Sequence, residues 1–307
     1  MICVPRGDVP TLKWDAFIER HHGGWFWHTS RWIDYSLAYT AVATDCSFAV
    51  IDKDELLAIV PLVLSPTHQL VMGGQVTPCP LFDWGTADRP ALARMVTQRA
   101  VSVTGTTGLP IQLHPRANQP NAEPPATVTP VVTDTYVVDL RDDNATIRAR
   151  FRKSYKSLIN QAERKYVITS DAYASTVEVA HQLHVDVSLR ETRPALTWAL
   201  MGQWAQEGYA FTVLARARDH GLPVGYIYVI VYKQWAYYAS SAVCRPNVAH
   251  GLQWTAMLHL KELGVPFYEL GHSADADAPR KEQGIAHFKA GFGGGTRPWL
   301  VVTDRTN

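Results

Sequence analysis

The sequence predicts an α/β (α+β) fold in two tandem units, each a mixed, mainly antiparallel sheet flanked by helices. A stretch crowded with proline, from Gly105 to Pro130, interrupts regular structure and marks a linker between two halves. In each half, two strand-like runs flank a short polar turn, at 47–64 and at 211–231. The units are therefore expected over 1–135 and 136–307, although two similar hairpins also arise by chance.

The composition is that of an ordinary soluble globular protein. Of the 307 residues, 47% are hydrophobic and 19% are charged. A formal net charge of +1 argues against a general attraction to nucleic acids or anionic membranes, but it leaves room for local basic patches. The start of the chain lacks the long apolar region of a signal peptide, and no run of about 18 apolar residues occurs. We expect a cytoplasmic protein without a membrane span.

The four cysteines lie far apart in the sequence. None of them stands at metal-ligand spacing from another cysteine or a histidine. The sequence therefore predicts no metal site and no disulfide framework.

The second half gives the clearer pattern of elements. Apolar residues from Ile147 to Ala162 recur at helical spacing and predict one helix over about 144–165, which Asp142, Asp143 or Asn144 can cap. A second helix is expected next, followed by three runs rich in β-branched and aromatic residues that predict an antiparallel meander. A helix that stops at Gly264 and a last strand complete the pattern. The expected ranges are 211–216, 224–231 and 235–243 for the meander, 248–263 for the helix and 266–271 for the last strand.

The first of these helices carries the one concentrated basic patch of the sequence. Its cationic residues face a single acid, Glu163, and lack acidic partners at helical spacing. The cations are Arg148, Arg150, Arg152, Lys153, Lys156, Arg164 and Lys165. Uncompensated like charges favour binding of a phosphate or another polyanion, whereas a solvated helix face explains each residue taken singly.

Near the C-terminus, one lysine stands between two aromatic residues and is followed by glycines, in the segment Phe288 to Gly295. A backbone rich in glycine turns sharply and approaches a ligand closely, although a surface turn with a solvated Lys289 fits the same string. Upstream, the start of the helix at His250 and Gly251 offers backbone N–H groups for a pyrophosphate or carbonyl oxygen. An ordinary strand-to-helix turn is the alternative there.

This order of elements resembles the GNAT acyltransferase fold. The ending FKAGFGG and the helix that opens with Phe151-Arg152-Lys153 are similar to those of the two-unit Fem family (FemABX), which includes peptidoglycan aminoacyltransferases. A closer resemblance is to Fem-like N-acyltransferases of surface-polysaccharide and amino-sugar pathways. Its short matching strings span nearly the whole chain, at 26–32, 47–48, 59–62, 184–198, 237–238, 250–254 and 268–271.

The resemblance implies transfer of an acyl group from an activated ester to an amine. Lys289, at the FK position, is expected to neutralise charge that develops on the carbonyl or the leaving group, or else to anchor an acceptor phosphate. Glu269 is the candidate proton acceptor, unless it lies exposed at a sheet edge. Tyr238 is expected to orient the acceptor or to protonate the leaving group; alternatively, Tyr237 and Tyr238 simply occupy opposite faces of a strand.

The resemblance also implies a set of residues that bind the donor and the acceptor. Arg190 and Arg193 suit a nucleotide phosphate and Trp198 suits a flat base or sugar, whereas core and surface roles explain these residues equally well. His28 lies one turn from Trp32 in the first unit, where the two close a cleft or only fill it. The full set of binding candidates is Arg152, Lys153, Tyr155, His184, Arg190, Arg193, Trp198, His250, Gly251, Trp254, Phe288 and His28.

The expected function is N-acylation of a primary amine, first of all a nucleotide-linked amino sugar, by a thioester such as acyl-CoA. The segment Arg245 to Gly251 departs from the Q/R-x-x-G-x-G/A loop by which GNAT enzymes hold coenzyme A, which puts that donor in doubt. The inserted helical arm of some Fem aminoacyltransferases is absent, so a transfer-RNA donor is less favoured but not excluded. Three alternatives remain: a tRNA-dependent aminoacyltransferase acting on a peptidoglycan precursor, N-acylation of an amino acid or aminated nucleotide, and a non-catalytic nucleotide-binding module.

Overall fold

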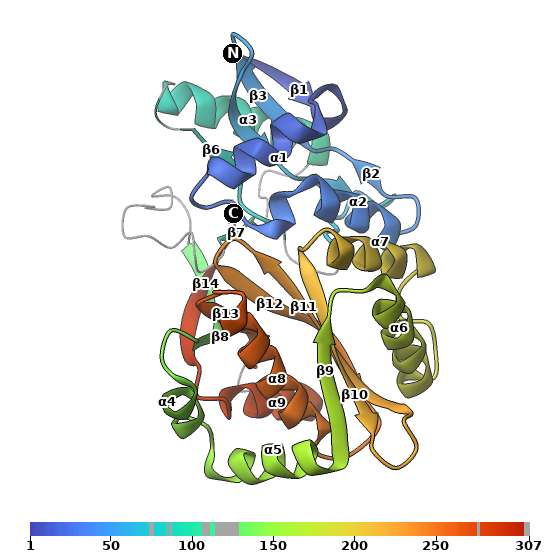
Figure 1. Cartoon of the computed structure of the whole chain (residues 1–307). Coiled ribbons are helices and arrows are strands. Elements are labelled where there is room, and N and C mark those ends of the chain that lie inside the picture. The colour runs from blue at the N-terminus through green and yellow to red at the C-terminus, as the bar shows by residue number, and fades with distance from the viewer. Residues whose placement is uncertain are drawn as a thin grey trace. The chain divides into compact units, whose positions relative to one another are not determined.

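A computed structural model describes residues 1–73, 77–83, 85, 88–105, 111–113, 129–274 and 277–303. The chain divides into two compact units (Figure 1). The first comprises Met1–Thr133 together with Pro298–Asn307, and the second comprises Asp134–Arg297. The predicted second unit ran over 136–307, whereas this grouping divides the last strand, β14 (Gly295–Thr303), between the two units; β14 pairs with β7 (Ile111–Leu113).

The second unit is built on a mixed sheet. Its strands lie in the order β14-β8-β13-β12-β11-β10-β9, and the neighbouring pairs from β8 to β9 are antiparallel except β12–β13. The strands are β8 (Thr129–Asp139), β9 (Tyr166–Asp171), β10 (Ala210–Ala217), β11 (Pro223–Tyr232), β12 (Trp235–Val243) and β13 (Phe267–His272). The helices are α4 (Asn144–Ala149), α5 (Lys153–Lys165), α6 (Ala174–Ser188), α7 (Ala195–Gln206), α8 (Val248–Glu262) and α9 (Arg280–Ala290). The predicted meander of three antiparallel strands is confirmed by β10, β11 and β12.

Helices cover both faces of this sheet. Side chains alternate along a strand, so successive residues of β11 face opposite sides. Tyr226 and Tyr228 send their hydroxyls to α6 and α7, where they reach His184 Nδ1 (2.7 Å) and the Met201 carbonyl (2.8 Å). Ile227 instead packs with the residues of α5 and α8. Figure 1 shows α5 and α8 on one side of these strands and α6 and α7 beside the other.

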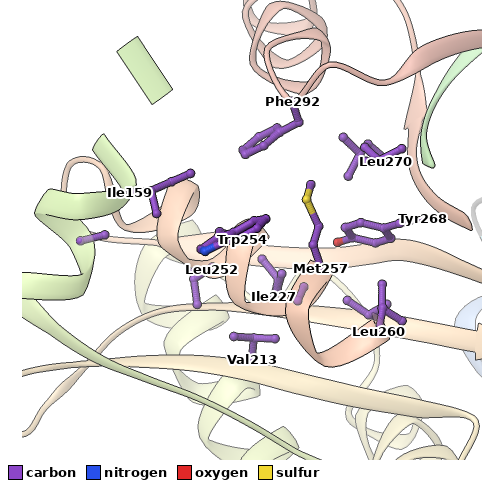
Figure 2. Packing of buried hydrophobic residues seen from close by; sticks show 14 of the residues in the cluster. Ile159, Val213, Ile227, Leu252, Trp254, Met257, Leu260, Tyr268, Leu270 and Phe292 are labelled. Atoms are coloured by element: carbon purple, nitrogen blue, oxygen red, sulfur yellow. The ribbon is translucent and has the colours of Figure 1, made fainter. Parts of the chain in front are cut away.

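The main core of the second unit lies between the sheet and α8. Met257 and Leu260 of α8 are fully buried, and Figure 2 shows them beside the Tyr268 ring of β13. Trp254 and Phe292 lie at the other end of the same cluster and meet Phe151 edge-on, with ring centroids 5.6 and 5.5 Å apart. The segment that follows α9 is therefore packed into the core through the Phe292 side chain.

The single helix predicted over 144–165 is wrong, because the structure divides it into α4 and α5. Asp143 caps α4 by accepting from the Thr146 N–H at 2.9 Å. The chain then leaves helical geometry at Arg152, whose N–H donates to the Gly291 carbonyl at 2.8 Å. The apolar spacing is continuous across the break, so the pattern predicts one helix. The break is a tertiary effect, since a carbonyl distant in sequence replaces a local partner.

The glycine-rich segment does not begin as a turn. Phe288, Lys289 and Ala290 form the last turn of α9, and a short connection leads from Gly291 to β14. Gly291 lies so close to Tyr155 that a Cβ built on it would overlap the phenol ring. This glycine is thus required for close packing of α9 on α5.

The pattern of the second half also omitted several elements. Strand β9 follows α5 directly, and two helices, α6 and α7, occupy the region in which one was expected. The helix predicted over 248–263 and the strand predicted over 266–271 correspond to α8 and β13.

The first unit has an antiparallel sheet in the order β1-β3-β4-β6, covered by α3. The predicted hairpin is confirmed, because β3 and β4 pair and Asp52 lies opposite Glu55 at the turn. The strands are β1 (Ile2–Pro5), β2 (Thr44–Asp45), β3 (Phe48–Asp52), β4 (Glu55–Val60), β5 (Val63–Leu64) and β6 (Leu81–Phe82). The helices are α1 (Thr11–Arg20), α2 (Ser30–Tyr39) and α3 (Arg89–Thr104), with 3₁₀ turns at Arg6–Asp8 and Phe26–His28.

The predicted linker lies mostly outside the described residues. Its residues 106–110 and 114–128 are not described, whereas 111–113 and 129–130 belong to β7 and β8. Within the described ranges, no helix is both long enough and apolar enough to cross a membrane.

We predict that Gly291→Ala destabilises the protein by about 1–3 kcal/mol, because the added methyl group overlaps the Tyr155 ring and forces α9 away from α5. Gly284→Ala is the matched control on the same helix, since its Cβ meets nothing within 4 Å. Alanine there should stabilise the helix by about 0.5–1 kcal/mol. Urea unfolding of both variants measures the difference, and equal stability would contradict the assigned packing.

Candidate active site

The candidate site lies where the two parallel strands of the second unit stop pairing. β12 and β13 pair over three positions, the last of which sets Tyr237 opposite Glu269. Beyond it β12 carries an extra residue, Ala239, because its pairing with β11 shifts register there. β13 likewise shifts register against β8 between Glu269 and Gly271. Such bulges bend strands and redirect side chains, and they are common next to active sites.

Lys289 reaches this point from the end of α9. Its ammonium donates to the His272 carbonyl at 3.3 Å, and its Nζ lies 3.0 Å from the position that a Cβ on residue 271 would occupy. Gly271 has a φ of +87°, which side-chain-bearing residues rarely adopt. A glycine at position 271 thus meets two needs, the left-handed backbone and the room for the ammonium group.

Glu269 is fully buried, with 0% of its surface exposed. Thr135 of β8 donates its hydroxyl to Glu269 Oε1 at 2.9 Å. The expectation of an exposed edge residue therefore does not hold, and Glu269 cannot meet bulk solvent. Burial lowers the pKa of Lys289 below its ordinary value, and the Glu269 carboxylate opposes that shift. The two predicted residues therefore form one electrostatic unit.

His272 is a third titratable group of this unit and was not predicted from the sequence. Burial lowers its pKa, and the Lys289 cation adds to that effect while Glu269 opposes it. The imidazole is thereby kept neutral, a state in which it can accept a proton. No motif in the sequence pointed to His272, because its role depends on the chain returning through α9.

The neighbouring tyrosines of β12 lie on opposite faces of the strand. Tyr238 packs against the core beneath α8 and donates to Ser241 Oγ. Tyr237 is the cross-strand neighbour of Glu269. The alternative in which the pair divides between two faces is therefore the one observed, and Tyr238 lies on the side of the core.

A second group of predicted residues gathers where α5, α8 and α9 meet. Tyr155 donates its hydroxyl to the Phe288 carbonyl at 3.0 Å, and its ring lies edge-on to His250 with centroids 4.4 Å apart. Arg152 stacks over the Tyr155 ring at 5.2 Å and contacts His287 Nε2 at 2.6 Å. These contacts hold α9 in place, and Lys289 follows directly after Phe288.

Gly251 and Trp254 have packing roles in α8. A Cβ on Gly251 would lie 2.6 Å from Ile168 Cδ1 and 2.7 Å from Ala162 Cβ, so glycine allows α5 and β9 to approach α8. Trp254 is 5% exposed. Gly251 thus serves the close packing of α8 on its neighbours.

A third group lies on the opposite face of the sheet, between α6, α7 and the strands. His184 contacts the Thr192 hydroxyl through Nε2 at 2.8 Å, in addition to its contact with Tyr226. Arg193 stacks over Trp198 at 4.9 Å and donates to Ser240 Oγ at 3.3 Å. The Trp198 ring is buried and also stacks on His181. In this state it offers no open surface to a base.

Two predicted binding residues stand apart from these groups. Arg190 is exposed at the connection between α6 and α7. His28 is buried in the first unit, where its Nε2 lies 2.9 Å from the Cys79 carbonyl and its Nδ1 lies 3.1 Å from the Trp25 backbone. Backbone groups of the first unit therefore occupy both nitrogens of His28.

The basic patch is smaller than the sequence indicated. Arg150 pairs with Asp142, and Arg148 donates to Asn160 and stacks on Trp254 at 5.5 Å. The expectation of uncompensated charge is wrong for Arg150, because its partner precedes the helix and lies outside helical spacing. Within the described part of the chain, four exposed cations of α5 form no ion pair: Lys153, Lys156, Arg164 and Lys165.

The described residues contain no group of three or more His, Cys, Asp or Glu side chains that could hold a metal ion. The side chains that the structure places at the candidate site are Lys289, Glu269, His272 and Tyr237.

The chain is similar over almost its full length to several solved structures. It superimposes on FemX with a TM-score of 0.66 at 11% identity, covering 99% of this chain and 98% of that chain. It superimposes on L-PGS from Bacillus licheniformis with a TM-score of 0.62 at 10% identity, covering 96% of this chain and 91% of that chain. For a tandem GNAT protein from the clavulanic acid biosynthesis pathway, the TM-score is 0.53 at 13% identity, with 98% of this chain and 97% of that chain covered.

The chain has the Fem-like, two-unit GNAT-type fold. The coverage of tandem GNAT and FemX structures across both units decides this point. No protein-family model and no curated protein matches the sequence, so the likeness is one of fold.

We predict that stability falls as the pH drops below about 6.5, the ordinary pKa of histidine. Burial lowers the pKa of His184 in the folded protein, so the unfolded chain binds a proton more readily and acid favours unfolding. The stabilising contribution is complete above the unfolded pKa and is lost as the pH falls through the folded pKa.

Urea unfolding at pH 5 and pH 7.5 measures this effect. His184→Gln should reduce the difference between the two pH values, whereas His22→Gln, at an exposed position, should not. An undiminished difference in His184→Gln would contradict the assignment.

Proposed function

We propose that the protein transfers an acyl group from an activated ester or thioester to an amine. The observation that carries this proposal is the partly buried Lys289 ammonium at the point where β12 and β13 part, together with the fully buried Glu269 that favours its charged form. A cation without full hydration stabilises developing negative charge more strongly than one in water. The likeness of fold to FemX and to a tandem GNAT protein supports the same class of reaction.

In the proposed reaction the amine nitrogen attacks the acyl carbon, and the carbonyl electron pair moves to oxygen. Lys289 donates to that oxyanion and keeps its own proton. When the electron pair returns, the bond from carbon to the leaving sulfur or oxygen breaks. His272, held neutral, takes the surplus proton of the amine and passes it to the leaving atom, so the products are an amide and a thiol or alcohol.

In this scheme Glu269 influences the charge of Lys289 and does not contact the substrate. Its complete burial keeps Glu269 away from bulk solvent, and the bond from the Thr135 hydroxyl to Oε1 holds its side chain in place. A fixed negative charge beside Lys289 keeps the ammonium protonated in spite of burial. The proton-acceptor role expected of Glu269 thus passes to His272 in the proposal.

The proposed acceptor is a nucleotide-linked amino sugar, and the proposed donor is an acyl thioester with acyl-CoA as first choice. The acceptor rests on the sequence resemblance, and the exposed Lys153 and Lys156 at the start of α5 suit nucleotide phosphates. The segment Arg245 to Gly251 departs from the usual coenzyme A loop, so the donor screen described below compares several carriers.

A second candidate is aminoacyl transfer from charged tRNA. The exposed cations at both ends of α5, with Arg164 and Lys165 at its C-terminal end, favour a polyanionic carrier. A donor screen separates the candidates. Thiol release is followed with acyl-CoA and acyl carrier protein, and deacylation with aminoacyl-tRNA, against amino-sugar nucleotides, amino acids and aminated nucleotides. Binding without turnover of any donor would support a non-catalytic module instead.

We predict that Lys289→Met lowers kcat by about 10²–10³ with little change in KM, because it removes a donor that acts mainly on the transition state. Lys281→Met, an exposed lysine on the same helix, is the control and should keep its activity. Steady-state kinetics with the best donor of the screen measures both variants. A normal kcat in Lys289→Met would remove this residue from the mechanism.

We predict that kcat falls at high pH as Lys289 loses its proton, with a midpoint below 10.5, the ordinary lysine value. Glu269 raises the pKa of Lys289, so Glu269→Gln should move this basic limb to lower pH. The pH profile of kcat tests the shift, and a basic limb that stays in place would disconnect Glu269 from Lys289.

A further inference from the structure

The two adjacent tyrosines of β12 differ in their surroundings. Tyr238 belongs to a polar chain beneath α8 that is partly buried: it donates to Ser241 Oγ, and the Gln253 amide also reaches its phenol. Gln253 in turn accepts from the Tyr268 hydroxyl at 2.9 Å. Each of these groups has a hydrogen-bond partner within the chain of contacts, and the Tyr268–Gln253 bond is its buried part.

Tyr237 faces away from this chain and toward the candidate site. In the strand register it stands directly opposite Glu269. Its ring atom Cε2 lies 3.9 Å from the point where a Cβ on residue 271 would stand, and Lys289 Nζ lies 3.0 Å from the same point. The point that a Cβ of residue 271 would occupy is therefore bordered by one phenol ring and one ammonium group.

We propose that Tyr237 is the second hydrogen-bond donor to the acyl oxygen, beside Lys289. This inference rests on the proposed acyl transfer and gives Tyr237 the role that the sequence had suggested for Tyr238. The Tyr237 hydroxyl keeps its proton throughout. It donates to the carbonyl oxygen more strongly as the C–N bond forms and the oxygen becomes negative, and less strongly once the bond to the leaving atom has broken.

The two tyrosines make a matched pair for a test. Tyr237→Phe should lower kcat about 10²-fold at nearly unchanged KM, the usual effect of removing one oxyanion donor. Tyr238→Phe should change kcat by less than about threefold but should lower stability in urea, because it leaves Ser241 without its buried partner. A larger loss of kcat in Tyr238→Phe than in Tyr237→Phe overturns the proposal.

Two acyl donors that differ in one atom give a measurement that a purely structural role of Tyr237 would leave unchanged. One acyl donor keeps its carbonyl oxygen, and in the other that oxygen is replaced by sulfur. Sulfur accepts hydrogen bonds only weakly. The wild-type protein should turn over the sulfur compound more slowly, and this ratio should shrink in Tyr237→Phe and persist in Tyr238→Phe. An equal ratio in all three proteins overturns the proposal.

Titration of Lys289 separates failure of this inference from failure of the proposed function. Lysines are dimethylated with a carbon-13 label, and the Lys289 signal is identified by its absence in Lys289→Met. Tyr237→Phe should shift the pKa of Lys289, and Tyr238→Phe should not. If no donor is turned over but the shift occurs, the acyl-transfer proposal fails while the placement of Tyr237 stands. If donors are turned over and Tyr237→Phe retains full kcat, the inference alone fails.

Discussion

The close approach of Gly291 to Tyr155 is the constraint on which the candidate site depends. The absent side chain at 291 lets the end of α9 lie against the phenol ring, and the Gly291 carbonyl accepts the Arg152 N–H that starts α5. Tyr155 returns a hydrogen bond to the Phe288 carbonyl, one residue before Lys289. Because both bonds use the backbone of the same helical turn, α9 has little freedom to slide. The position of the Lys289 ammonium follows from this contact.

The electrostatics of the site follow from burial. An ammonium group withdrawn from water tends to lose its proton, which is seen as the lowered pKa of Lys289. A carboxylate that is itself buried opposes this tendency, and Thr135 satisfies one of its oxygens. Opposite charges withdrawn from water add little net stability, since desolvation offsets the attraction between them. The charges of Lys289 and Glu269 are therefore no large source of folding stability.

Much of the fold could be predicted from the sequence because it depends on local pattern. The alternation of β10, β11 and β12 and the spacing of α8 follow from residues close together in the chain. The break between α4 and α5 could not be predicted, because the Arg152 N–H finds its partner at Gly291. The same holds for Arg150, whose acid partner Asp142 lies before the helix and outside its periodicity. In both cases a contact outside the helical repeat decides the outcome.

The sequence by itself determined the class of fold, and its resemblance to the Fem family pointed to Lys289 and Glu269 as candidates for catalysis. It did so because strand alternation, helix spacing and an FK string before glycines are properties of neighbouring residues. Only the tertiary structure decided that Glu269 is buried, that His272 joins the pair, and that Tyr237 lies on the site side of β12 while Tyr238 lies on the core side. Burial and the face of a strand depend on which elements cover it, and those elements come from distant parts of the chain.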